Sequence, residues 1–79
     1  MTPENAVLHR LSQRAPDATI CPSEAARDLT GDGGDWRAHM DDVHLAVDHL
    51  VEEGRITLSW KGVPMERRDG PYRIGWAKK

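Results

Sequence analysis

The chain has 79 residues, of which 38% are hydrophobic and 30% charged, and its formal net charge is −2. A chain this short builds one hydrophobic core, so we expect a single domain over residues 1–79. The slightly negative total gives no general attraction to nucleic acid or to membranes. The single cysteine, Cys21, excludes an internal disulfide and a multi-cysteine zinc site. The sequence also has no apolar segment long enough for a signal peptide or a membrane span. The single cysteine and the lack of such a segment together predict a cytoplasmic protein.

The first half of the chain predicts two short helices separated by a bridging strand. Residues 2–4 supply a capping hydroxyl, a proline for the first helical position and an acid in the first turn, which are signals for a helix start. Proline within residues 15–17 ends this helix. Residues 19–21 are long enough only for a bridging strand. A second helix begins at residues 21–24 with a capping box, and the glycines of residues 30–34 end it.

The strongest periodic signal predicts a long third helix. We expect Asp35 to cap this helix and Gly54 to end it, because glycine adopts positive φ without a steric penalty. One face of the helix is apolar at the spacing of successive helical turns. The residues of this face are Trp36, Met40, Val43, Val47, Leu50 and Val51.

The last part of the chain predicts an antiparallel hairpin. Apolar and polar residues alternate over residues 55–60 and again over residues 72–76, as in amphipathic strands. Residues 61–71 would form a long tip that contains glycine and proline. Trp60 and Trp76 are expected on the inward face of the hairpin. The expected cross-strand pairs are Ile56 with Trp76 and Trp60 with Tyr72.

The order helix, short strand, short helix, long helix and hairpin is typical of a winged helix-turn-helix, an α+β fold whose hairpin is the wing. Its fold-determining segments are Thr19-Ile20-Cys21-Pro22-Ser23-Glu24, Asp35-Trp36-Arg37 with Met40, Glu53-Gly54-Arg55-Ile56, Lys61-Gly62 and Gly70-Pro71-Tyr72-Arg73-Ile74. In these segments the chain resembles a small bacterial family of winged-helix proteins known only as a domain of unknown function. The resemblance implies the architecture over roughly residues 4 to 76. Membership of the wider winged-helix class implies DNA binding, although a fold alone establishes no activity.

Charge is unevenly distributed along the chain. Residues 1–54 hold four Arg or Lys against eleven Asp or Glu, a balance of −7, whereas residues 55–79 hold seven against two, a balance of +5. A winged-helix hairpin lies along the nucleic-acid backbone, where cations contact phosphates. The alternative is a solvated, charged hairpin that resists aggregation at its edges. The predicted phosphate contacts are Lys61, Arg67, Arg68 and Arg73.

The outward side of the long helix points to two functions. Arg37 and His44 are the residues suited to reading double-stranded DNA, whereas acidic residues on the same side would repel phosphates. Leu45 lies opposite the buried face, two turns after Ala38, so an apolar strip favours a protein partner or a weak homodimer. We therefore predict a nucleic-acid-binding or transcription-regulatory module, with protein interaction as the alternative. The predicted protein-interaction residues are Ala38, Asp41, Asp42 and Leu45.

Metal binding and catalysis are weaker alternatives. Asp41, His44 and Asp48 share one helix face, but this spacing is also common on solvated acidic helices, so no metal is expected. Cys21 stands at a helix N-terminus, a position also found for nucleophilic cysteines, but no base is assigned to it unless His9 of the preceding helix lies nearby. A small buried residue that caps the helix is the simpler interpretation. The sequence shows no phosphate loop or catalytic triad. We expect no enzyme activity, no cofactor and no small-molecule substrate.

Overall fold

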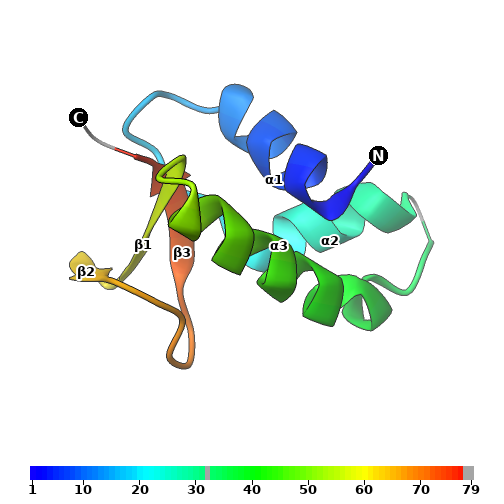
Figure 1. Cartoon of the computed structure of the whole chain (residues 1–79). Helices are drawn as coiled ribbons and strands as arrows, with labels where there is room; N and C mark the ends of the chain where they lie inside the picture. The colour runs from blue at the N-terminus through cyan, green and yellow to red at the C-terminus, as the bar shows by residue number, and fades with distance from the viewer. Residues whose placement is uncertain (32, 78–79) are drawn as a thin grey trace.

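The computed structural model describes residues 1–31 and 33–77. Within that part of the chain, three α-helices, a 3₁₀ helix and a three-stranded antiparallel sheet form an α+β fold, and their order is consistent with a winged helix (Figure 1). The helices are α1 (Pro3–Ser12), α2 (Pro22–Thr30), the 3₁₀ helix η1 (Trp36–His39) and α3 (Met40–Glu52). The strands are β1 (Ile56–Trp60), β2 (Val63–Met65) and β3 (Arg73–Trp76). The predicted fold class is confirmed.

The starts of α1 and α2 follow the predicted capping residues. The Thr2 hydroxyl accepts a hydrogen bond from the Asn5 backbone N–H at 3.1 Å, which satisfies one of the unpaired donors of the first turn. At α2, the backbone N–H of Cys21 donates to the Glu24 carboxylate at 2.8 Å. Cys21 occupies the N-cap position, as predicted, but its side chain is half-buried rather than buried.

The long helix differs from the prediction at its start and agrees with it at its end. The side chain of Asp35 makes no capping hydrogen bond, and its φ and ψ of −88° and 87° differ from the extended geometry of a cap. Asp35 thus occupies the N-cap position of the 3₁₀ turn η1, through which the chain enters α3, but the prediction that it caps the helix with its side chain was wrong. At the other end Gly54 has φ 71°, and the backbone N–H groups of Gly54 and Arg55 donate to carbonyls of the last turn. These paired bonds form a Schellman motif.

The hydrophobic core lies between the three α-helices and one face of the sheet (Figure 1). On the predicted apolar face Val43, Val47 and Leu50 are buried, whereas Trp36, Met40 and Val51 are only partly buried against the core. Ile20 joins the sheet as an isolated bridge to Ile74, with backbone hydrogen bonds of 2.8 and 2.9 Å. Among the described residues, no helix combines the length and apolar character needed to cross a membrane. The largest fully buried side chains are Val7, Leu11, Ile20, Val43, Val47, Leu50 and Ile74.

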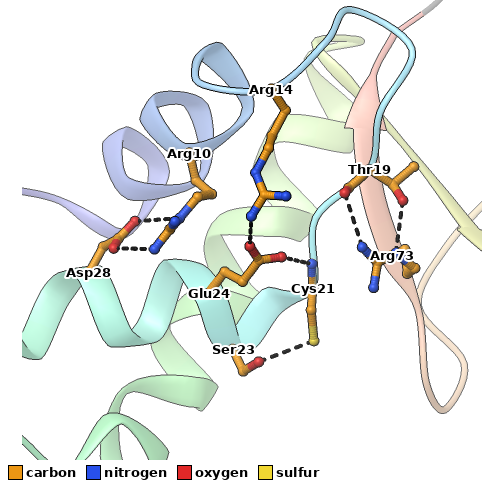
Figure 2. A network of polar contacts seen from close by, with 8 residues as sticks. All are labelled: Arg10, Arg14, Thr19, Cys21, Ser23, Glu24, Asp28 and Arg73. Carbon is orange, nitrogen blue, oxygen red and sulfur yellow. Dashed lines mark hydrogen bonds and ion pairs between the residues drawn. The ribbon is translucent and has the colours of Figure 1, made fainter.

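Two ion pairs fasten α1 to α2 outside the core. The Arg10 guanidinium donates two hydrogen bonds to the Asp28 carboxylate, at 2.9 and 2.6 Å. Arg14 donates to Glu24, whose other oxygen already accepts from the Cys21 N–H (Figure 2). These contacts occupy Arg10 of α1 and Arg14 of the segment that follows it, so Glu24 and Asp28 of α2 are partly neutralised within the fold.

The wing contains a strand that was not predicted. Lys61 and Gly62 have φ of 51° and 81°, so they form a two-residue turn with two positive φ angles, as a type I′ turn requires. This turn brings β2 back against β1, and the strand order in the sheet is β2-β1-β3. The expectation of one long tip over residues 61–71 was wrong for its first part. The predicted pairing of Ile56 with Trp76 is confirmed.

The position of Trp60 also corrects the prediction. The ladder between β1 and β3 ends at the pair of Ser59 with Arg73, and Trp60 pairs instead with Val63 of β2. Trp60 retains 39% of its surface exposed, so it does not join the core as expected. The alternation was predicted correctly, but no helix covers the end of the hairpin.

Candidate nucleic-acid interface

Two of the four predicted wing cations point into solvent. Lys61 sits in the turn between β1 and β2, and its Nζ lies 6.0 Å from the centroid of the Trp60 ring. Arg67 follows β2 and is exposed. Over residues 1–31 and 33–77 neither side chain forms an ion pair with a carboxylate. Both are therefore available for an external anion.

Arg68 is engaged within the molecule. Its guanidinium donates two hydrogen bonds to the Asp48 carboxylate, at 2.7 and 2.8 Å, and so fastens the wing to α3. The hydrogen bond from Arg68 lowers the pKa of Asp48, and the same bond raises the pKa of Arg68. Asp48 is half-buried beneath this arginine. A phosphate would have to compete with Asp48 for this arginine.

Arg73 is engaged on another element. Its Nε donates to the Thr19 hydroxyl at 2.8 Å and its terminal nitrogen donates to the Thr19 backbone carbonyl at 3.0 Å (Figure 2). These bonds hold β3 against the segment that precedes α2. The Arg73 guanidinium therefore has internal partners, and it provides the Thr19 backbone carbonyl with a donor that water would otherwise have to supply.

His44 forms the second contact between α3 and the wing. Its Nδ1 lies 2.6 Å from the Tyr72 hydroxyl, and the ring centroids are 5.6 Å apart. Burial and the nearby Arg68 lower the pKa of His44, and burial raises the pKa of Tyr72. The phenol thus keeps its proton and the imidazole is favoured in its neutral form, so the hydroxyl and Nδ1 share one hydrogen bond. Only the Nε2 side of His44 can serve an external ligand.

The corner between α2 and α3 gathers two arginines on one indole. The Arg37 guanidinium carbon lies 4.5 Å from the centroid of the Trp36 ring, and that of Arg27 lies 4.9 Å from it. Both arginines are exposed, and such stacking leaves guanidinium N–H groups able to donate. Arg37 was predicted as a contact. Arg27 was not, because only the packing of α2 beside η1 brings it to Trp36.

The predicted protein-interaction residues lie together on the outward side of η1 and α3. Leu45 exposes 59% of its surface, and the other three predicted residues are also exposed. Their side chains take no part in the hydrogen bonds between α3 and the wing. The predicted residues of this outward face are Ala38, Asp41, Asp42 and Leu45.

The residues weighed for metal binding and for catalysis have other partners. In the part of the chain that the structure describes, no group of three or more His, Cys, Asp or Glu side chains is placed to hold a metal ion. His44 bonds to the Tyr72 hydroxyl and Asp48 to Arg68. The Cys21 sulfur accepts a hydrogen bond from the Ser23 hydroxyl at 3.1 Å (Figure 2).

Comparison with known proteins places the chain in a family. Residues 2–77 match the sequence profile of a family described as "Protein of unknown function (DUF3253)". A search of the curated proteins found no match. Because the profile covers nearly the whole chain, from the cap of α1 to the end of β3, the chain belongs to the DUF3253 family.

Proposed function

We propose that this domain is a winged-helix module that binds nucleic acid in a regulatory role and has no catalytic activity of its own. The observation that carries the proposal is the pair of exposed wing cations, Lys61 and Arg67, which form no ion pair with the described residues and lie in the segment whose charge balance is +5. Cations that lack an internal carboxylate lose little when they approach a phosphate. Cytoplasmic localisation belongs to the same proposal.

The distribution of charge favours contact through the wing rather than deep insertion of α3. Asp41 and Asp42 lie exposed in the first turn of α3, where they are favourable to the helix dipole but repel a phosphate backbone. Arg37 and Arg27 flank this turn at the α2–α3 corner. Backbone contacts from the wing and the corner give affinity with little sequence preference, since base edges carry the sequence information.

Fluorescence anisotropy with a labelled duplex of random sequence tests this function. Three phosphate contacts, from Lys61, Arg67 and Arg37, would give a logarithmic slope of affinity against salt of about −3. We expect measurable binding at low salt that weakens linearly on this logarithmic plot. Absence of binding at low salt, or a slope near zero, would contradict the proposal.

The exposed face of α3 supports a second candidate function, contact with a protein partner or a weak homodimer. Leu45 is the observation that favours it, because 59% of this leucine faces solvent beside Ala38. In a dimer, Leu45→Lys would bury an unpaired charge and the variant would be monomeric. Sedimentation velocity of the wild type and of Leu45→Lys tests this function. A wild type that stays monomeric at all concentrations would contradict the homodimer.

A further inference from the structure

The end of the wing carries apolar side chains that the fold does not cover. Trp60 pairs with Val63, and Leu58 pairs with Met65 one step closer to the core. Directly paired residues share one face of a sheet, so Trp60 and Val63 lie on the same face as Leu58, which is buried against the core. Trp60 exposes 39% of its surface and Val63 exposes 64%. In Figure 1 this end of the hairpin projects to the side of the helices.

The turn holds a cation next to this exposed indole. Lys61 and Gly62 form the two-residue turn, and the Lys61 Nζ lies 6.0 Å from the Trp60 ring centroid. Two-residue turns with positive φ match the twist of the strands, so the turn fixes the backbone of Lys61 directly beside that of Trp60. Arg67 adds a second exposed cation at the far end of β2. The wing end therefore presents an aromatic surface within a positively charged segment.

An aromatic surface beside a cation matches the two parts of a nucleotide. A base stacks on an indole whatever its identity, and the ammonium group pairs with the phosphate that follows. Base pairs in the interior of a duplex already stack on both sides and only its two terminal pairs expose a face, so an unpaired base offers the indole a much more accessible face. We propose that Trp60 and Lys61 bind an unpaired nucleotide, and that the domain prefers single-stranded or overhanging nucleic acid to a blunt duplex. This inference rests on the proposed nucleic-acid function and names its ligand.

Anisotropy titrations with three labelled DNA probes test this preference. The probes are an oligothymidine, a blunt duplex, and the same duplex with a thymidine overhang. We expect the overhang and the single strand to bind more tightly than the blunt duplex. Trp60→Leu removes the stacking of one base, so its affinity for the overhang and for the single strand should be roughly 5- to 150-fold lower. Trp60→Phe, which keeps an aromatic ring, should retain most of the affinity.

Matched measurements separate this inference from the proposed function. Val63→Thr changes the neighbouring exposed residue, keeps a β-branched side chain, and should bind all three probes like the wild type. If the wild type binds the blunt duplex as tightly as the overhang and Trp60→Leu changes nothing, the inference fails while the proposed function stands. If no probe binds, both fail. If the wild type self-associates and Trp60→Leu is monomeric, the wing end is a protein contact and the inference is overturned.

Discussion

His44 is the residue through which pH acts most directly on the junction of α3 and the wing. Its Nδ1 is hydrogen-bonded to the Tyr72 hydroxyl, while burial and Arg68 lower its pKa below the ordinary value of 6.5. The folded protein therefore binds fewer protons at this site than the unfolded chain does. By linkage, the contribution of His44 to stability is complete above this ordinary pKa and is lost as the pH falls below it.

We predict that the melting temperature of the wild type falls between about pH 7 and about pH 5, and that it falls less in His44→Gln. The glutamine amide does not titrate and can still accept from the Tyr72 hydroxyl. Asp48, whose pKa is lowered from 3.8, stays charged throughout this range and does not contribute. His9→Gln, which replaces an exposed histidine of α1, is the control. Identical pH profiles for His44→Gln and the wild type would show that His44 does not titrate on unfolding.

Lys61 combines an unfavourable backbone conformation with an exposed charge. Its φ of 51° is one that asparagine and glycine adopt more readily than lysine. We predict that Lys61→Asn raises the free energy of unfolding by up to about 1 kcal/mol and weakens nucleic-acid binding at the same time. Urea denaturation and anisotropy measure the two effects. Lys61→Ala, which lacks the preference for positive φ, should weaken binding without stabilising the fold.

A lower stability of Lys61→Asn would mean that the turn conformation is not a source of strain. Unchanged binding in both variants would remove Lys61 from the interface. The two properties therefore separate the structural and functional roles of one residue.

At the scale of the element, α3 is where sequence and structure agree best. Leu50 is fully buried among α1, the sheet and its own helix neighbours, whereas Leu45, five residues earlier, exposes 59% of its surface. Leu50→Ala should cost about 2–5 kcal/mol, a large part of the roughly 4–12 kcal/mol expected for a domain of this length. Leu45→Ala is the matched control and should change stability by less than about 0.5 kcal/mol. Chemical denaturation of both variants measures this difference. Equal losses of unfolding free energy in the two variants would contradict the assignment of Leu50 to the buried face and Leu45 to the exposed face.

Local signals in the sequence correctly predicted the helix ends that depend on residues close together in the chain. Thr2 caps α1 through a contact three residues away, and Gly54 ends α3 through its own φ angle. The strand β2 was missed because Pro64 lies at its centre and proline is disfavoured within a sheet. In the structure β2 is an edge strand, where a missing N–H group is tolerated.

The sequence predicted which cations could form the candidate interface, but not which of them are already bonded to other residues of the fold. Lys61, Arg67 and Arg37 were predicted and lie exposed. The engagement of Arg68 by Asp48 joins residues 20 positions apart, and that of Arg73 by Thr19 joins residues 54 apart. Such partners depend on how α3, the wing and the segment before α2 pack together. No periodicity or local motif encodes them.

Across the whole molecule, charge is distributed so that a net acidic domain is proposed to bind nucleic acid through one basic end. Arg10, Arg14, Arg68 and Arg73 have internal partners, whereas Lys61 and Arg67 form no ion pair within the part of the chain that the structure describes. Binding should therefore depend on where a charge lies rather than on the net charge of the protein. Arg67 and Arg14 allow a matched comparison, because each substitution by glutamine removes one positive charge.

The most direct test measures the affinity for nucleic acid as a function of salt for the wild type, Arg67→Gln and Arg14→Gln. Each phosphate contact contributes about 0.9 to the slope on a duplex and about 0.7 on a single strand. We predict that Arg67→Gln lowers the magnitude of the slope by about that amount and weakens binding to every sequence alike. Arg14→Gln, which removes an arginine paired with Glu24, should leave the slope unchanged. Equal slopes for all three proteins, or no binding by the wild type, would contradict the claim.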